Sequence, residues 1–254
     1  MHKQWGALLF LLHIMLFSVG VAAQQEKPRL FLYTENMPPF SYLVDNHADG
    51  INVALIRQLC QRLRLECVVQ LMPWRRAFEK AQAQQYAGVF STARTPSREQ
   101  LFKWVGPIST ANAFLFRLKG RTEINPLNLE DAKQFKVAVA RGDVFEDYFR
   151  TRGFDNQNNL IVFADKADAV PLLRAKRIDL LVGLNINVNS WLQLHGLNSD
   201  AVEVALPLGE VSKVYLALNI EFPEELVQQM QAEVELMLEQ GVLDALLQHY
   251  GVVP

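Results

Sequence analysis

The segment INVALIRQLCQRLRLECVVQL, residues 51–71, decides the fold class because it joins an amphipathic helix to a strand. Apolar residues recur every three or four positions in its first part, which is the spacing of one helix face. They are Val53, Ile56, Leu59 and Leu63. The short apolar run from Cys67 to Leu71 contains adjacent valines and favours a strand.

The segments on either side continue this alternation. An apolar strand is predicted over Arg29–Tyr33, before the helix. Pro73 stands near the start of a second predicted helix, a position that proline favours. Val89 and Phe90 form the next short strand. The β-α-β-α-β order predicts an α/β fold, with a mostly parallel sheet and helices on its faces.

The alternation starts again after the polar stretch 119–125, which predicts a second lobe. Predicted strands there cover 135–140, 160–163 and 178–182, and predicted helices cover 144–151 and 167–175. A strand over 211–218 is expected to return the chain to the first lobe. A long helix from Pro223 and a last helix over 242–249 complete the prediction.

These segments predict two lobes joined by a two-strand hinge. Lobe 1 is expected to comprise residues 24–116 and 213–254, with the strand over 114–117 at its boundary. Lobe 2 is expected to comprise residues 117–212.

The N-terminus reads as a signal peptide. Lys3 supplies a positive charge, residues 6–19 are almost wholly apolar, and Val21-Ala22-Ala23 fits a cleavage site after Ala23. The alternative is an uncleaved anchor over residues 6–23, which is barely long enough to span a bilayer. We expect residues 1–23 to be removed and the protein to be periplasmic. The formal net charge of -2 gives no general case for nucleic-acid binding.

Ligands of open α/β sheets bind outside the carboxyl ends of the strands. Four loops meet that description: 34–42, 73–74, 91–98 and 141–144. The third reads Ser91-Thr92-Ala93-Arg94-Thr95-Pro96-Ser97-Arg98. A guanidinium binds a carboxylate through paired hydrogen bonds, so Arg94 and Arg98 are candidates for an anion clamp. The alternative is two solvated surface arginines.

The other loops supply further candidates. Trp74 is a stacking wall for a planar or apolar ligand part, or else a packing residue. Glu35 can pair with a cationic ligand group, or is a solvated acid. Gly142 precedes a predicted helix whose free N–H groups favour an anion at Asp143 and Val144.

Sequence motifs of catalysis are missing from these loops. The histidines beyond residue 23 are His47, His195 and His249, and they lie elsewhere. No Gly-x-Ser-x-Gly, His-Glu-x-x-His or phosphate-loop pattern is present, and no metal-ligand cluster is apparent. We therefore expect a binding protein without a cofactor or metal. The enzyme alternative would depend on Glu35 or Asp143 as an acid or base.

The chain from residue 24 onward resembles the family 3 periplasmic solute-binding proteins, the polar amino-acid binders of ABC importers. The matching segments occur in the family's order along the chain. They are Pro38-Pro39-Phe40-Ser41-Tyr42, Gly50-Ile51-Asn52-Val53, Thr95-Pro96-Ser97-Arg98-Glu99, Gly142-Asp143, Arg177-Ile178-Asp179 and residues 238–251.

This resemblance implies a type II periplasmic-binding fold, a small ligand with a carboxylate held between the lobes, a membrane permease as partner, and a monomer. It implies that Arg98 clamps the carboxylate, helped by Ser91, Thr92 and the backbone at Asp143 and Val144. Trp74 falls at the family's aromatic wall, and Glu35 where basic-amino-acid binders place an acid. Some relatives are dehydratases of small carboxylates, and a stand-alone sensing protein is a further alternative.

Two features depart from the family pattern, a missing acid and an added arginine. The family's amino-acid binders hold the ligand's α-ammonium with an acid about five residues after Arg-Ile-Asp, where this chain has Gly183, Leu184 and Asn185. Arg94 is an additional cation. A buried ammonium without a counter-charge is unfavourable, so organic acids, amino-acid derivatives and small peptides join amino acids as candidate ligands.

Cys60 and Cys67 are the two cysteines of the chain. An even cysteine number in an exported protein favours a disulfide, with two buried free thiols as the alternative. Some histidine and basic-amino-acid binders of the family carry a cysteine pair at this spacing, so the resemblance also implies the Cys60–Cys67 bond.

Overall fold

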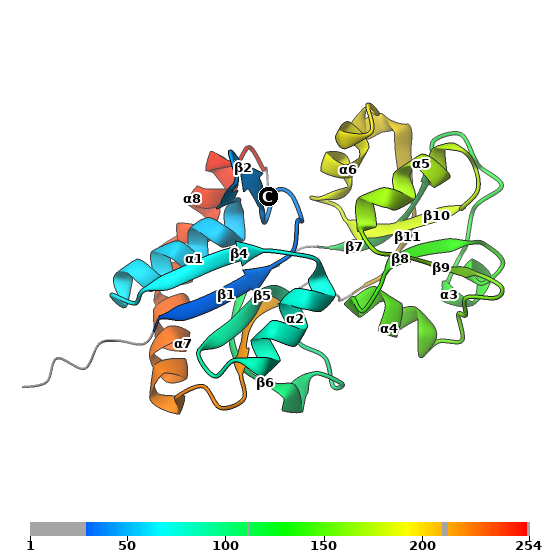
Figure 1. The fold of residues 1–254 in the computed structure, drawn as a ribbon. Helices are drawn as coiled ribbons and strands as arrows, with labels where there is room; N and C mark the ends of the chain where they lie inside the picture. The colour runs from blue at the N-terminus through cyan, green and yellow to red at the C-terminus, as the bar shows by residue number, and fades with distance from the viewer. Residues whose placement is uncertain (1–28, 111, 210–212, 253–254) are drawn as a thin grey trace, which may run out of the picture.

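The computed structural model describes residues 29–110, 112–209 and 213–252. The chain forms two α/β lobes that lie side by side (Figure 1). Each lobe contains a five-stranded sheet flanked by helices, which confirms the predicted fold class. The predicted signal peptide lies outside the described residues.

The first sheet has the strand order β4-β1-β5-β12-β6. Its strands are β1 (Leu30–Thr34), β4 (Cys67–Leu71), β5 (Ala87–Ala93), β6 (Phe102–Thr110) and β12 (Lys213–Asn219). β1 pairs in parallel with β4 and β5, whereas β12 runs antiparallel to β5 and β6. The predicted β-α-β-α-β series therefore forms the parallel part of this sheet, and the returning strand enters it in the opposite direction.

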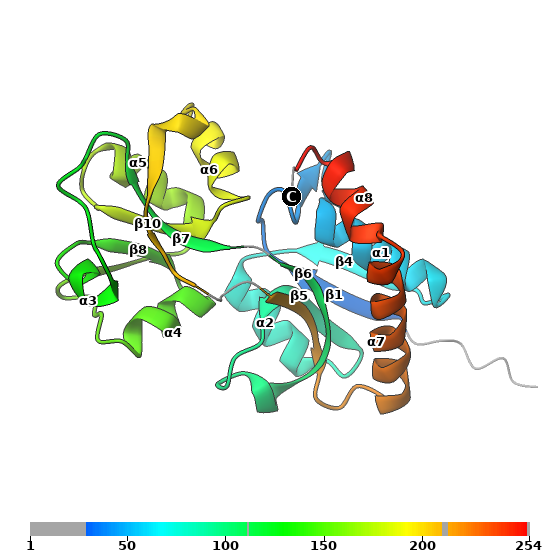
Figure 2. The ribbon, with the colours of Figure 1, turned by 180° about the vertical axis from the view of Figure 1, so that it is seen from behind.

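Alternate residues of β1 face two different cores. Leu30 and Leu32 are fully buried in the core under α1 (Ile51–Arg62), α7 (Glu224–Glu239) and α8 (Val242–His249). Tyr33 packs on the other face with α2 (Trp74–Ala83). The predicted apolar face of α1 is confirmed, because Val53, Ile56 and Leu59 are fully buried. Figure 2 shows α7 and α8 beside α1, on the side of the first sheet away from α2.

The second sheet has the order β11-β7-β10-β8-β9. Its strands are β7 (Ala113–Leu118), β8 (Val137–Ala140), β9 (Leu160–Phe163), β10 (Leu180–Leu184) and β11 (Val202–Pro207). Its helices are α3 (Leu129–Ala132), α4 (Val144–Arg150), α5 (Ala169–Arg174) and α6 (Val188–Leu194). β10, β8 and β9 are parallel, and β7 is antiparallel to β10 and β11. In each sheet, four strands thus run in one direction and one strand, β12 in the first sheet and β7 in the second, runs in the opposite direction.

The smaller elements are a hairpin and three turns of 3-10 helix. The hairpin pairs β2 (Tyr42–Val44) with β3 (His47–Asp49) and begins at the last residue of the predicted loop 34–42. The 3-10 turns are η1 (Glu99–Leu101), η2 (Lys166–Asp168) and η3 (Ser199–Ala201). Among the described residues, no helix combines the length and apolar character needed to cross a bilayer.

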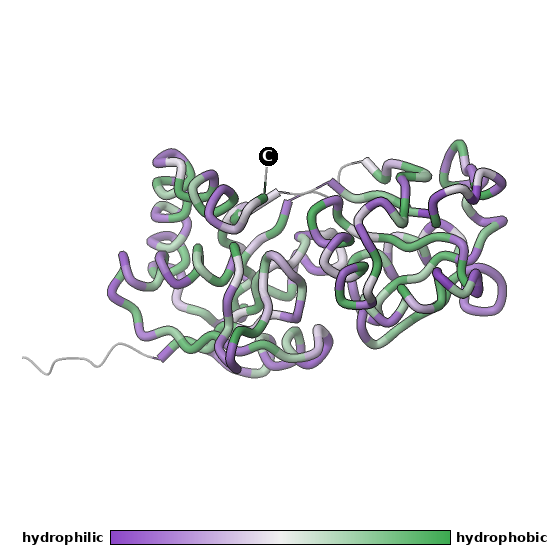
Figure 3. The backbone as a smooth tube through the Cα atoms, turned by 90° about the horizontal axis from the view of Figure 1, so that it is seen from above, coloured by the Kyte–Doolittle hydropathy of each residue, from purple (hydrophilic) through white to green (hydrophobic). Residues whose placement is uncertain are grey.

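The chain passes from the first sheet to the second between Thr110 and Ala113. The predicted lobe boundary after residue 116 falls inside β7, and β7 pairs with β10 and β11 of the second sheet. Its apolar sequence favours a strand but does not specify which sheet will pair with it. The chain returns between Pro207 and Lys213. Viewed from above, hydrophobic segments run through the interior of both lobes (Figure 3).

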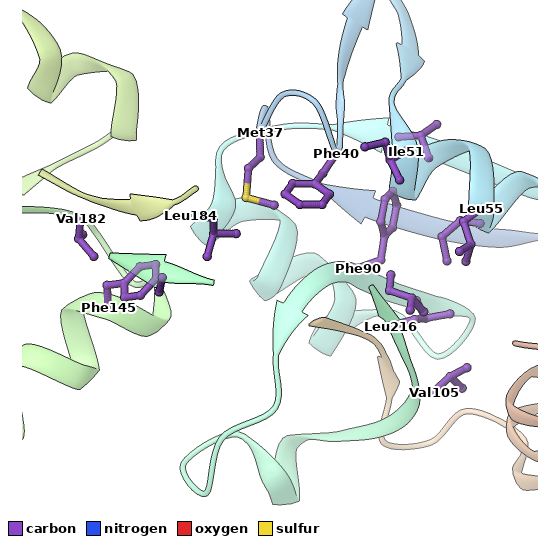
Figure 4. Packing of buried hydrophobic residues seen from close by; sticks show 14 of the residues in the cluster. Met37, Phe40, Ile51, Leu55, Phe90, Val105, Phe145, Val182, Leu184 and Leu216 are labelled. Carbon is purple, nitrogen blue, oxygen red and sulfur yellow. The ribbon is translucent and has the colours of Figure 1, made fainter. Parts of the chain in front are cut away.

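The two lobes are also in apolar contact. One continuous cluster of buried residues includes Met37 and Phe40 of the first lobe and Leu184 of the second. In Figure 4, Met37 lies between Phe40 and the end of β10, where Leu184 sits. All three side chains are buried. Buried apolar side chains of both lobes thus belong to one cluster.

A disulfide joins Cys60 near the end of α1 to Cys67 at the start of β4. The bond closes a short connection, with a sequence separation of 7 residues. It ties the helix that covers the first sheet to the edge strand of that sheet, as expected.

Replacing both Cys60 and Cys67 by alanine is expected to lower the free energy of unfolding by about 2–3 kcal/mol, because the unfolded chain regains the entropy of a short closed loop. Urea unfolding of the oxidised wild type and the double variant measures this difference. Two titratable thiols in oxidised, denatured wild type would contradict the disulfide.

Candidate functional site

Arg98 lies at the end of the arginine loop, immediately before η1, and is buried with 5% of its surface exposed. Its Nη1 donates to Oγ1 of Thr92 at 3.1 Å, and its Nη2 donates to the carbonyl oxygen of Gly142 at 3.2 Å. The guanidinium stacks near the rings of Trp74 and Phe78, at 5.4 and 5.3 Å from their centroids. The candidate clamp is therefore a buried cation that faces the second lobe.

Trp74 joins the same cross-lobe contact. It begins α2, is buried, and donates from Nε1 to the Gly142 carbonyl oxygen at 2.8 Å. Gly142 adopts a φ of 72°, a conformation that favours glycine and turns the chain between β8 and α4. One second-lobe carbonyl thus accepts hydrogen bonds from two first-lobe side chains.

Ser91 and Thr92 lie near the end of β5, where a bulge interrupts its pairing with β12. Ser91 has a φ of 60°, which is uncommon for a residue other than glycine and is found at functional sites. Its Oγ accepts a hydrogen bond from Nδ2 of the buried Asn52 at 2.8 Å. Of these two hydroxyls, Thr92 is the one in contact with Arg98.

Asp143 caps α4. Its Oδ1 accepts hydrogen bonds from the N–H groups of Phe145 at 2.8 Å and Glu146 at 2.9 Å. The N–H groups of Phe145 and Glu146 are therefore bonded to a side chain of the protein. The predicted anion position is the backbone at Asp143 and Val144, where the Asp143 N–H donates to the Ala140 carbonyl oxygen at 3.4 Å. Val144, the first residue of α4, lines a neighbouring cavity instead.

Glu35 and Lys166 form a buried ion pair across the two lobes. Lys166 Nζ donates to Glu35 Oε1 at 2.8 Å and lies 3.6 Å from Asp143 Oδ2, and the Lys166 and Glu35 side chains are each 14% exposed. Lys166 is not among the site residues predicted from the sequence. The rule that ligands bind at the carboxyl ends of strands points to it, because η2 follows β9 after a short loop.

The charges of these residues act on one another. Burial lowers the pKa of Arg98, while the negative charges of Asp143, Asp147 and Glu35 oppose that effect. Arg98 nevertheless remains protonated at neutral pH, because the ordinary pKa of an arginine lies far above neutral pH. Burial also works to lower the pKa of Lys166, but attraction to Glu35 and Asp143 raises it above its usual range. Both cations therefore stay charged.

Arg94 lies apart from this cluster. It is exposed, forms a two-pronged ion pair with Glu99 at 2.8 and 2.5 Å, and stacks on Trp104 at 5.7 Å. Arg94 and Val144 line a cavity of about 660 Å³ between the arginine loop, α4 and the start of β12. The structure thus brings Arg98, Trp74, Thr92, Glu35 and Asp143 together and leaves Arg94 at the mouth of the interface.

The positions where the family places an ammonium-binding acid carry no acid here. A Cβ on Gly183 would lie 2.4 Å from Val188 Cγ2 and 2.9 Å from Trp191 Cζ3, so this backbone packs closely against α6. Leu184 joins the apolar contact with Met37, and Asn185 is exposed. Any acid for a ligand cation must therefore come from another element.

A two-lobe α/β fold with a buried arginine between the lobes is the arrangement expected of solute-binding proteins, a class whose lobes close around a ligand by a hinge motion. The model of the bacterial extracellular solute-binding proteins, family 3, matches residues 31–253, and the chain belongs to this family. No curated protein sequence matches the chain.

Solved structures share the fold at low sequence identity. An ancestral arginine-binding protein bound to arginine has 20% identity and a TM-score of 0.76, covering 87% of this chain and 97% of that one. A histidine kinase sensor domain similar to periplasmic binding proteins has 17% identity and a TM-score of 0.78, with 88% and 96% covered. The ancestral amino-acid-binding protein AncCDT-1, a precursor of cyclohexadienyl dehydratase, has 20% identity and a TM-score of 0.72, with 87% and 94% covered.

The Trp74–Gly142 hydrogen bond should favour contact between the lobes in the ligand-free protein. Trp74→Phe keeps an aromatic ring but removes the donor, and loss of about 1 kcal/mol would shift the closed-to-open ratio about five-fold toward open. Small-angle X-ray scattering of the ligand-free protein would register this as a larger radius of gyration.

Trp104→Phe is the matched control. Trp104 Nε1 donates to the Glu99 carbonyl oxygen within the first lobe, at 3.3 Å. An equal change, or no change, in the scattering of the two variants would contradict a role for the Gly142 contact in lobe closure.

Proposed function

We propose that this protein captures a small carboxylate-bearing solute, an amino acid or a related organic acid or derivative, between its two lobes and delivers it to the permease of an ABC importer. The observation that carries the proposal is the buried Arg98 guanidinium bonded to the Gly142 carbonyl across the lobes. A carbonyl oxygen is an uncharged acceptor. A ligand carboxylate in its place would form stronger, charge-assisted hydrogen bonds.

The surrounding residues complete the proposed site. Thr92 holds the guanidinium from the first lobe, and Trp74 provides an aromatic wall beside it. Ser91, Asp143 and Val144 border the same interface, with Arg94 at its mouth. Ligand binding would replace direct contacts between the lobes by contacts through the ligand, and would shift the open–closed equilibrium by its greater affinity for the closed form.

The proposal also includes delivery of the captured solute to a membrane permease. The proposed protein is a periplasmic monomer released by cleavage after Ala23, and its closed form presents both lobes to the membrane partner as one surface. The family's extracellular location supports this proposal.

Binding without chemistry is favoured by the state of the two acids that an enzyme would need. Glu35 is held by Lys166, and Asp143 uses Oδ1 to cap α4. Both carboxyl groups face the Lys166 ammonium, at 2.8 Å for Glu35 Oε1 and 3.6 Å for Asp143 Oδ2, so each is engaged as an ion-pair partner. A dehydratase-like enzyme and a stand-alone sensor remain alternatives. Incubation of the protein with a carboxylate that it binds would yield a new compound only if the protein is an enzyme.

A thermal-shift screen of amino acids, organic acids and small peptides is expected to reveal a carboxylate that raises the melting temperature by mass action. Arg98→Ala should then weaken its binding by about 30-fold or more, because truncating one partner of a buried charge pair typically costs about 2–5 kcal/mol. Arg98→Lys should also lose affinity, because a lysine lacks the planar fork. Isothermal titration calorimetry measures both.

Arg75→Ala is the matched control, because Arg75 is an exposed arginine of α2 paired with Glu79. Full affinity in Arg98→Ala, or an equal loss in Arg75→Ala, would show that Arg98 is not the carboxylate clamp.

A further inference from the structure

The buried ion pair between the lobes contains a cation that belongs to the protein itself. Lys166 Nζ lies between Glu35 of the first lobe, at 2.8 Å, and Asp143 of the second lobe, at 3.6 Å. The side chain of Asp143 is only 4% exposed, and its Oδ2 atom is buried without a hydrogen-bond partner. Glu35 and Asp143 therefore form an acidic position of the kind that would receive an ammonium group, and Lys166 Nζ points into it.

The same acids surround the proposed carboxylate clamp. Glu35 and Asp143 act electrostatically on Arg98 as well as on Lys166, so the four residues form one charged cluster. Burial raises the pKa of Asp143, against the pull of Lys166. Within this cluster, Arg98 is the cation that can bind an incoming anion. The negative charge of Glu35 is already neutralised by the Lys166 ammonium.

A zwitterionic amino acid would meet this cluster at a disadvantage. Its carboxylate can reach Arg98, but its ammonium needs a desolvated negative partner in the same small space. Glu35 and Asp143 Oδ2 both face Lys166 Nζ, at 2.8 and 3.6 Å, so either acid can serve only by giving up its contact with that ammonium. A largely buried lysine without its ion-pair partners is strongly unfavourable. Toward β10, the interface presents Leu184 and Met37, which are apolar (Figure 4).

We propose that Lys166 fills the cation position formed by Glu35 and Asp143, so that the protein selects carboxylates that lack an α-ammonium group, such as 2-hydroxy acids, over the corresponding amino acids. Lys166 acts here as a specificity-determining residue. This inference rests on the proposed function, because it takes Arg98 as the group that receives the carboxylate. It narrows the ligand class to organic acids.

The test compares acids that differ only in the substituent on the α-carbon. The pairs are lactate and alanine, malate and aspartate, 2-hydroxyglutarate and glutamate, and phenyllactate and phenylalanine, each as the L-enantiomer. Isothermal titration calorimetry provides the ratio of the two dissociation constants for each pair. Taking this ratio separates selectivity for the α-substituent from any general change in affinity or folding.

Wild type is expected to bind the hydroxy acid of its preferred pair about ten-fold or more tightly than the amino acid, since a buried ammonium without a counter-charge is costly. Lys166→Met removes the internal cation and leaves Glu35 without it, so the ratio should move by about ten-fold or more toward the amino acid. Lys166→Arg keeps the charge and should keep the wild-type preference.

The double variant Glu35→Gln/Lys166→Met is the control for mechanism. It removes the principal acid together with the lysine, so the amino-acid preference gained by Lys166→Met should be lost. If Lys166→Met does not fold, Glu35→Gln alone serves: it leaves Lys166 in excess, and the preference for the hydroxy acid should be retained or increase.

Two results would overturn the inference. Tighter binding of amino acids than hydroxy acids by wild type would do so, as would an unchanged ratio in folded Lys166→Met, and both would leave the proposed capture of a carboxylate intact. If wild type and the variants bind neither member of any pair, while a ligand without a carboxylate raises the melting temperature, the proposed function fails together with the inference.

Discussion

The carbonyl oxygen of Gly142 accepts hydrogen bonds from Arg98 and Trp74, and through them it connects the second lobe to the first. Trp74 begins α2 shortly after β4, and Arg98 lies in the loop after β5, so both donors follow the carboxyl ends of first-lobe strands. The acceptor lies on the turn after β8 of the second sheet. The left-handed turn at Gly142 and the cap by Asp143 hold that turn in place. The position of the buried guanidinium relative to the second lobe depends on this arrangement.

Burial determines how the charges of the interface behave. An arginine that is 5% exposed loses most of its hydration, so nearby acceptors and acids must compensate. Thr92 and Gly142 supply hydrogen bonds, while Glu35 and Asp143 supply negative charge. Lys166 then balances those acids. The cations and acids are mutually dependent, because removal of one would leave its partner as an uncompensated charge in the interface.

Much of the fold could be predicted from the sequence because local patterns carry it. The buried face of α1 follows from helical spacing, and the short apolar runs that form β1, β4 and β9 are strands as predicted. The lobe to which β7 belongs could not be predicted in this way. An apolar strand of six residues fits either sheet, and its place is decided by pairing with β10 and β11, which lie far along the chain.

The sequence by itself determined the two α/β series, the cysteine pair and the arginine loop, because these depend on residue type and spacing over short distances. Only the tertiary structure decided which arginine is buried: Arg98 is enclosed by Trp74, Phe78 and Gly142, whereas Arg94 finds Glu99 five residues away. Only the tertiary structure could bring Lys166 to Glu35, since 131 positions separate them in the chain. Long-range ion pairs depend on how the two lobes pack, and no local pattern records that packing.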